Sequence, residues 1–271
     1  MLVTLKEILK TQRAVAAFNV YGYEDAISVV KGAEELNCPV ILMTNKDCVD
    51  FIAIEIIGPM LVTIAKAAKV PVCVHLDHSK SISDIKRAVA SGYTSVMYDG
   101  SQLPFEDNLR DTKEVVSIAH PAGVSVEAEI GSVGYSDPSI VAKAEYTDPD
   151  QALYFAENTG VDALAVAIGT VHRMKIQEAR LDFDLLKAIK AKVETPLVIH
   201  GSSGVKDEDL TKMCDLGVSK INLGTSLRMT FGNTLRKTVN EMTEEFDRLK
   251  FFPASMAAVK EKAKEKMLLV R

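Results

Sequence analysis

Residues 71–100, PVCVHLDHSKSISDIKRAVASGYTSVMYDG, contain a complete strand–helix–strand unit. Two short segments rich in β-branched residues, Val72–Asp77 and Ser95–Asp99, enclose the amphipathic stretch Ser81–Ser91. This stretch opens with a serine followed three residues later by Asp84, a capping pattern that predicts the start of a helix. Strands that alternate with helices in this way are typical of parallel sheets, in which each helix connects two neighbouring strands.

The same alternation runs along the whole chain and predicts eight strands. They are Val15–Asn19, Val40–Thr44, Val72–Asp77, Ser95–Asp99, Ser125–Glu129, Ala163–Ile168, Leu197–His200 and Lys220–Leu223. An α/β barrel with eight strands needs about 250 residues. The 271 residues of this chain therefore predict one TIM (β/α)8 barrel domain over residues 1–271. Beyond the eighth strand, Leu227–Leu249 and, after Pro253, Ala254–Leu269 predict the last barrel helix and a C-terminal helical extension.

Composition excludes several classes of protein. The 32 basic and 37 acidic residues give a net charge of −5, so electrostatics does not favour nucleic acid as a partner. No stretch approaches the ~18 apolar residues of a membrane span, and residues 1–11 lack the apolar core of a signal peptide. The four cysteines contain no C-x-x-C pair, which is typical of reduced thiols. We therefore expect a cytoplasmic protein without nucleic-acid or membrane partners.

Polar residues stand at or just after the end of every predicted strand. They are Asn19, Asn45, Asp77 with His78, Asp99, Glu127 with Glu129, His172, His200 and Asn222. A turn-forming asparagine or aspartate explains any one of these positions, but a barrel without a site needs no such residue at all eight. Because a closed barrel carries its active site at the C-terminal ends of its strands, we expect these side chains to line it.

Three histidines follow predicted strands three, six and seven: His78, His172 and His200. A catalytic zinc site uses three protein ligands and leaves one position open, and imidazoles from three strand ends can meet at one point. The sequence therefore predicts a metal site. Asp77, beside His78, is interpreted as a general acid or base, the alternative being a group that orients an imidazole.

Further polar groups surround this predicted site. Glu127 and Glu129 share one face of the fifth strand, and Asp99 ends the fourth. Carboxylates at these positions indicate that they serve a metal or a proton, with ion pairs to Lys or Arg as the alternative. The glycine-containing segments His200–Gly204 and Asn222–Ser226 follow strands seven and eight, where this fold binds phosphate.

The chain resembles the class II (metal-dependent) ketose-bisphosphate aldolases, which include fructose- and tagatose-bisphosphate aldolases. The matching segments follow one another along nearly the whole chain: Ala17–Asn19, Pro39–Ile41, His75–His78, Ser95–Ser101, Val126–Gly131, Thr159–Gly169, His200–Gly204 and Lys220–Asn222. This resemblance implies a zinc-dependent lyase of carbohydrate metabolism. It would cleave a phosphorylated ketose reversibly to dihydroxyacetone phosphate and an aldehyde, with Zn²⁺ stabilising the enediolate. The family also implies a homodimer or homotetramer.

The resemblance assigns a role to each site residue. His78, His172 and His200 resemble the zinc ligands, Asp77 the proton donor to the aldehyde oxygen, and Glu129 and Asp99 a second, looser metal site. The set that binds the sugar phosphate comprises Asn19, Arg173, Gly201, Ser203, Asn222, Thr225 and Arg228. Within this set Gly201, Ser203 and Thr225 resemble the site of the first phosphate. A monovalent cation, Na⁺ or K⁺, is implied beside it, and Arg228 resembles the group that binds the far phosphate.

Several positions depart from the family pattern. Arg173 replaces the usual glycine after the second zinc histidine, and Asn45 replaces a common serine. The loop that usually carries a proton-moving carboxylate reads Gly134–Pro138, in which Asp137 is the nearest equivalent. Fructose-specific members have aspartate where this chain has Gly224, so a small residue here resembles the tagatose-bisphosphate enzymes or indicates another substrate.

Two alternatives stay open beside the aldolase. One is a substrate-shifted or inactive relative that binds zinc and a sugar phosphate, which the departures at Arg173 and in the 131–146 loop favour. The other is a metal-dependent hydrolase on the same barrel. A hydrolase of that kind would need a bridging carboxylated lysine or a two-metal His-x-His pair at the first strand, which ends in Asn19 without a histidine.

Overall fold

The computed structural model describes residues 1–10, 13–136, 139 and 142–271, and within them eight parallel strands close into a barrel. The strands pair in the order β1-β10-β9-β7-β5-β4-β3-β2. Their bounds are β1 Val15–Asn19, β2 Val40–Thr44, β3 Val72–Ser79, β4 Ser95–Tyr98, β5 Ser125–Ile130, β7 Ala163–Val166, β9 Leu197–Ile199 and β10 Val218–Leu223. The predicted TIM barrel is confirmed, and its strands lie where the sequence pattern puts them.

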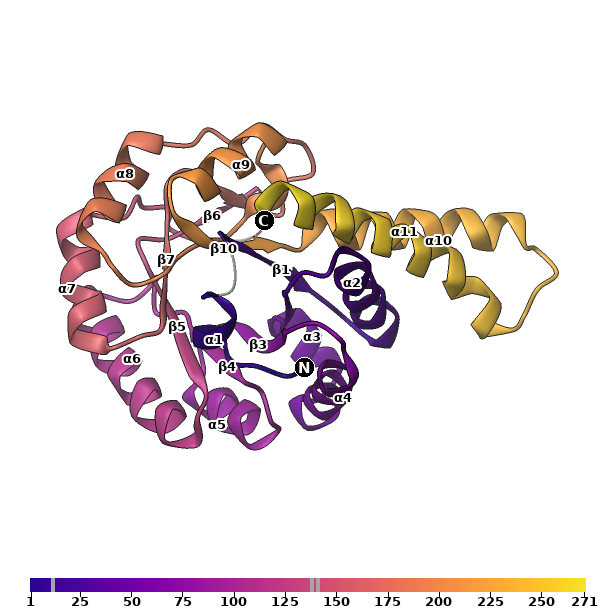
Figure 1. The fold of residues 1–271 in the computed structure, drawn as a ribbon, viewed down its shortest axis with the longest axis horizontal. Helices are drawn as coiled ribbons and strands as arrows, with labels where there is room; N and C mark the ends of the chain where they lie inside the picture. Colours follow the sequence, from indigo (N-terminus) through magenta and orange to yellow (C-terminus); the bar gives the residue numbers. More distant parts are fainter. Residues whose placement is uncertain (11–12, 137–138, 140–141) are drawn as a thin grey trace.

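Helices surround the barrel on its outside (Figure 1). They are α2 Tyr23–Leu36, α4 Ile54–Ala67, α5 Ile82–Ala90, α6 Phe105–Ala119, α7 Pro149–Thr159, α8 Phe183–Lys192, α9 Asp207–Asp215 and α10 Thr225–Glu241. Shorter elements are α1 Leu5–Ile8, α3 Lys46–Phe51 and the 3₁₀ turns η1 His120–Ala122 and η2 Ser202–Gly204. Two further strands, β6 Gly134–Tyr135 and β8 Val171–His172, pair with each other beyond the ends of β5 and β7.

In the described residues no helix combines the length and the apolar composition that crossing a membrane requires.

Alternation along the strands sorts the side chains into two layers. On β3, Val72, Val74 and Leu76 face the helices and join the large outer core, whereas Cys73 belongs to the apolar interior of the barrel. Helix α1 closes the lower end of that interior with Leu5 and other residues that no solvent reaches. Since successive strand residues point to opposite faces, the inward positions above Cys73 hold the polar side chains of the upper barrel.

A buried ion pair separates the apolar lower interior from the polar upper end. Lys220 Nζ lies 2.7 Å from Glu127 Oε2, and neither side chain is exposed to solvent. The other oxygen of this carboxylate accepts a hydrogen bond from His200 Nε2 at 2.9 Å. Glu127 therefore forms an ion pair inside the barrel. For this carboxylate the sequence had left two roles open, service to a metal or a proton and an ion pair with Lys or Arg.

The C-terminal extension is present, but its break lies earlier than the sequence pattern predicts. Helix α11 runs over Arg248–Val270 and forms with α10 a hairpin that projects from the barrel (Figure 1). Asp247 caps α11 by accepting from Leu249 N at 2.9 Å, so the helix begins there and Pro253 lies inside it. A proline inside a helix removes one backbone hydrogen bond and costs about 3 kcal/mol, more than the roughly 1 kcal/mol that a cap contributes. The packing of α11 against α10 and α2 therefore holds this helix together.

The buried pair leads to a prediction about stability. We expect Lys220→Met to lower the free energy of unfolding by about 3–5 kcal/mol, because the substitution leaves the Glu127 carboxylate buried without its cation. The double variant Lys220→Met/Glu127→Gln should regain most of this loss, since no charge then remains unpaired. Urea denaturation followed by circular dichroism measures both values.

Lys187→Met is the matched control, because Lys187 pairs with Asp184 on the exposed surface of α8. Its denaturation midpoint should equal that of the wild type. An unchanged midpoint for Lys220→Met would show that the buried pair contributes nothing to folding.

Candidate functional site

A backbone irregularity at the end of β3 places two adjacent side chains at the same cavity. In a regular strand Asp77 and His78 would point to opposite faces. The pairing of β3 with β4 shifts register between Leu76 and Ser79, and His78 adopts a φ of +50°. The bend turns the imidazole over the barrel opening, beside Asp77. Positive φ is uncommon outside glycine and marks sites where strain is kept for function.

The three predicted histidines come together at this opening. The ring centroid of His78 lies 4.4 Å from that of His200 and 4.9 Å from that of His172, and the latter two are 6.2 Å apart. His78 and His200 belong, with Asp77, to a group whose ligand atoms lie within 4.8 Å of one another. His172 stands at the edge, with its ring 4.8 Å from that of Tyr135 on β6.

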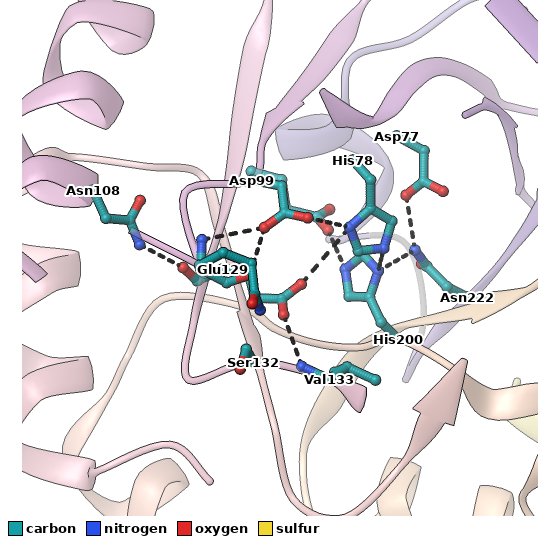
Figure 2. A network of polar contacts seen from close by, with 12 residues as sticks. Asp77, His78, Asp99, Asn108, Glu129, Ser132, Val133, His200 and Asn222 are labelled. Atoms are coloured by element: carbon teal, nitrogen blue, oxygen red, sulfur yellow. Dashed lines mark hydrogen bonds and ion pairs between the residues drawn. The ribbon is translucent and has the colours of Figure 1, made fainter. Parts of the chain in front are cut away.

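The hydrogen bonds of His78 and His200 determine where their lone pairs point. His200 Nε2 lies 2.9 Å from Glu127 Oε1, and His78 Nδ1 lies 2.9 Å from Asp99 Oδ2. Carboxylates only accept, so these two nitrogens carry the ring protons. The remaining nitrogens, His200 Nδ1 and His78 Nε2, face each other at 2.8 Å with their lone pairs (Figure 2). Two facing lone pairs require a cation, a proton or a metal ion, between them.

The donor set fits a divalent metal ion. Imidazole nitrogens whose other N–H is held by a carboxylate are the usual ligands of zinc. A second group, His78 with Asp99 and Glu129, also has its ligand atoms within 4.8 Å. Glu129 Oε2 is buried, and the described residues offer it no hydrogen-bond partner. Such an orphaned buried oxygen indicates a cation beside it. The residues therefore suit one ion at His78 and His200, and a second at the carboxylates.

Electrostatics in the cluster also favours positive charge. Burial opposes the charged form of His78, but the carboxylates of Asp77 and Asp99 outweigh it and raise the pKa of this imidazole to about 10. Burial, reinforced by the charge of Asp99, raises the pKa of Glu129 to about 8. Burial also holds the pKa of His172 and of His200 well below the ordinary value. Asp77 and Asp99 thus concentrate negative charge beside His78, whereas the raised pKa of Glu129 favours the neutral form of that carboxyl group until a cation lies beside it.

Two asparagines hold the carboxylate of Asp77 in place. Asn19 Nδ2 donates to Oδ2 at 2.8 Å, and Asn222 Nδ2 donates to Oδ1 at 3.2 Å. Asp77 itself is only 3% exposed, and it lies on the opposite side of the His78 ring from Asp99 (Figure 2). A carboxylate fixed by two amides next to a metal site is positioned to exchange a proton with a bound molecule.

The loops after β9 and β10 form the wall of a cavity of about 470 Å³ that contains these groups. Gly201 has a φ of +67°, and a Cβ there would lie 2.9 Å from the backbone of Val171, so no other residue fits. A Cβ on Gly224 would lie 2.6 Å from Asn19 Oδ1, which explains the small residue at this position. Thr225 begins the 17-residue helix α10, whose N-terminus favours an anion.

Arg173 and Arg228 line the same cavity and contact one carboxylate, that of Asp47. Arg173 has a φ of +62°, a conformation that glycine adopts freely and that costs other residues about 1–2 kcal/mol. This backbone accounts for the glycine of the family pattern. An exposed ion pair returns only about 0.2–1 kcal/mol, so the contact with Asp47 does not offset that cost.

The structure brings together all the predicted site residues that it describes. Asp137, the predicted loop carboxylate, lies outside the described residues. Sequence reasoning missed Asp47 and Tyr135, and it gave no role to Lys220 beneath His200. The signal for Lys220 was the period-two spacing that puts it on the same strand face as Asn222.

Comparisons with known proteins agree with this geometry. A family model described as fructose-bisphosphate aldolase class-II matches residues 1–271. A relative from Escherichia coli K12 with the name uncharacterized protein YdjI is 39% identical over 258 residues, which cover 94% of this chain and 91% of the relative.

Solved structures give the same result. The crystal structure of the YdjI aldolase from Escherichia coli K12 superposes with a TM-score of 0.88 at 36% identity, covering 100% of this chain and 97% of that one. Fructose-bisphosphate aldolase from Campylobacter jejuni has a TM-score of 0.83 at 20% identity, over 99% of this chain and 96% of the other. The latter similarity bears on the fold alone.

The hydrogen bond between Asp99 and His78 leads to a prediction about metal affinity. We expect Asp99→Asn to weaken zinc binding by about 10–100-fold, because a neutral amide orients the imidazole less firmly and no longer balances the charge of a dication. Competition with a chromogenic chelator measures the affinity. Asp111→Asn is the control, since Asp111 accepts from Tyr98 outside the site. Equal zinc affinity in Asp99→Asn and wild type would contradict the prediction.

Proposed function

This chain belongs to the class II fructose-bisphosphate aldolase family, and on that premise we propose that it cleaves a phosphorylated ketose reversibly. The substrate is of the fructose- or tagatose-1,6-bisphosphate type, and the products are dihydroxyacetone phosphate and an aldehyde. The observation that carries the proposal is the pair of imidazole lone pairs that face each other at 2.8 Å beside the fixed carboxylate of Asp77.

His78, His172 and His200 would hold the metal, for which we propose Zn²⁺. A dication there supplies Lewis-acid stabilisation of the negative charge that develops on the enediolate. Glu127 and Asp99 keep the protons of His200 and His78 on the nitrogens that face away from the ion. Glu129 and Asp99 would hold the second, looser ion.

Asp77 performs the proton transfer at the carbon–carbon bond. In the cleavage direction its carboxylate takes the proton of the C4 hydroxyl group while the C3–C4 electron pair passes to the ketose fragment. In the synthetic direction the same proton returns to the aldehyde oxygen. Asn19 and Asn222 hold both carboxylate oxygens in place through this exchange. A further carboxylate must move the proton at the enediolate carbon that was C3 of the ketose, and Asp137 is the proposed group.

The remaining cavity residues bind the substrate. Gly201, Ser203 and Thr225 would hold the first phosphate against the N-terminus of α10, with Na⁺ or K⁺ beside it. Arg228 and Arg173 would hold the far end of the substrate. Gly224 and Arg173, which differ from the fructose-specific pattern, favour tagatose 1,6-bisphosphate or a shifted ketose phosphate as the substrate.

A panel assay with zinc-loaded and chelated protein tests the proposal. Release of dihydroxyacetone phosphate from fructose 1,6-bisphosphate, tagatose 1,6-bisphosphate or a ketose 1-phosphate supports it, and chelation should abolish the release. Stoichiometric zinc without any cleavage would identify an inactive relative. Release of inorganic phosphate without an aldehyde would identify a hydrolase.

For Asp77 we expect a loss of turnover rather than of metal. Asp77→Asn should lower kcat by about 10²–10⁴-fold, the usual contribution of a general acid–base group. Zinc content by atomic absorption should match the wild type, because the imidazoles are untouched. Asp84→Asn, a surface change on α5 with the same chemistry, is the control. A kcat within a factor of two of wild type would remove Asp77 from the mechanism.

We also propose a homodimer or homotetramer that assembles through the α10–α11 hairpin in the cytoplasm. The hairpin projects from the barrel (Figure 1), and near its tip Phe246 and Leu249 are 93% and 77% exposed. Two large apolar side chains exposed close together in the chain favour contact with another protein surface more than a single one would. Phe246→Asp combined with Leu249→Asp should shift the mass from oligomer to monomer in light scattering, and Glu244→Lys should not. A monomeric wild type would rule the assembly out.

A further inference from the structure

The three histidines of the candidate metal site differ in what holds their rings. His78 and His200 each have one ring nitrogen 2.9 Å from a buried carboxylate. In the part of the chain that the structure describes, no carboxylate lies within ion-pair distance of His172. The ring centroid of His172 lies instead 4.8 Å from that of Tyr135 and 4.9 Å from that of His78. The orientation of this third imidazole therefore depends on packing against other rings.

The backbone of His172 is held from two directions. On one side β6 and β8 pair in parallel with Tyr135 opposite His172, and Ser136 N donates to His172 O at 3.0 Å. On another side the loop after β9 packs closely, since a Cβ on Gly201 would lie 2.9 Å from the carbonyl carbon of Val171 and 3.2 Å from His172 N. With the backbone fixed, the imidazole can change direction only by rotation about its own side-chain bonds.

The phenol ring of Tyr135 restricts that rotation. Its plane is inclined by 36° to the plane of the His172 imidazole, and the centroid distance of 4.8 Å is typical of an aromatic pair in contact. A flat neighbour at this distance limits the torsion about the bond to the imidazole, and with it the direction of each ring nitrogen. In the described residues no hydrogen bond to the hydroxyl of Tyr135 accompanies the contact, so the ring itself makes it.

Residues 132–136, which we call the support segment, also reach the carboxylate of the second metal position. Val133 N donates to Glu129 Oε1 at 3.2 Å (Figure 2). At the start of the segment Ser132 exchanges two backbone hydrogen bonds with Glu145, at 2.8 and 3.0 Å, which anchor it to the loop that returns to the barrel. The support segment thus holds Glu129 at one end and His172 at the other.

We propose that Tyr135 is a positioning residue for His172. Its ring takes the part that a carboxylate takes for each of the other two histidines, and keeps one nitrogen of His172 directed at the metal ion. The inference rests on the proposed function, because it assigns how the third ligand of the same ion is held. Tyr135 lies in Gly134–Pro138, where the chain departs from the family pattern, so the resemblance to that family does not imply this role.

Zinc affinity, measured by competition with a chromogenic chelator, tests the role directly. Tyr135→Leu keeps an apolar side chain but removes the flat ring, and should weaken zinc binding by about three- to tenfold, the size expected for one aromatic contact. Tyr135→Phe keeps the ring and should bind zinc as tightly as the wild type. Tyr154→Leu is the matched control, because the ring of Tyr154 packs near Phe105 on the outer helices, away from the site.

A double-mutant cycle separates positioning from a general effect on stability. In a His172→Ala background no imidazole remains to be positioned, so Tyr135→Leu should not weaken zinc binding further. The visible absorption spectrum of the cobalt-substituted protein reports the ligands of the ion without any turnover. In that spectrum Tyr135→Leu should shift towards His172→Ala, and Tyr135→Phe should match the wild type.

Three outcomes would overturn the inference. They are an equal loss of zinc affinity in Tyr135→Phe, an additive loss in the His172→Ala background, and a Tyr135→Leu variant whose zinc affinity is unchanged and whose KM alone is raised. The last result would make Tyr135 a contact of the substrate. If zinc affinity and cobalt spectrum respond as expected but the wild type cleaves no ketose phosphate, the proposed function fails and the role of Tyr135 stands.

Discussion

Two hydrogen bonds from imidazole to buried carboxylate set the chemistry of the barrel opening. Glu127 holds the Nε2 proton of His200, and Asp99 holds the Nδ1 proton of His78. Because each ring has only two nitrogens, these bonds leave both remaining lone pairs directed at one point. Lys220 ties the first of these carboxylates to the interior of the barrel. The candidate metal site therefore depends on charges that lie below it, out of reach of solvent.

The backbone is strained at two positions, His78 and Arg173, where a regular strand or loop would direct the side chain away from the site. His78 would point away from the cavity in an unbroken strand, and its positive φ reverses that direction. Arg173 adopts a conformation suited to glycine and thereby places a guanidinium at the cavity edge. Such conformations persist only where the surrounding structure holds them, here a closed barrel on one side and the β6–β8 pair on the other.

The cavity has two ends with different charge. At the inner end, the carboxylates of Asp77, Asp99 and Glu129 favour cations, which raises the pKa of His78 to about 10. At the outer end, the N-terminus of α10 and the two arginines favour anions. A sugar phosphate matches this arrangement, because its reacting carbonyl group needs a cation and its phosphate groups need donors. The family to which the chain belongs uses substrates of this kind, and the geometry of this chain is suited to one.

The sequence by itself determined the fold, and it pointed to most of the residues that the structure gathers at the candidate site. Alternating strands and helices predicted all eight barrel strands to within two residues of their ends, because hydrophobic period and caps are local properties. Only the tertiary structure decided how the residues act together. The inward turn of His78, the pairing of Lys220 with Glu127 and the meeting of two arginines at Asp47 join segments that are distant in sequence. No local sequence pattern predicts these contacts. The segments come within hydrogen-bonding distance only when the barrel closes.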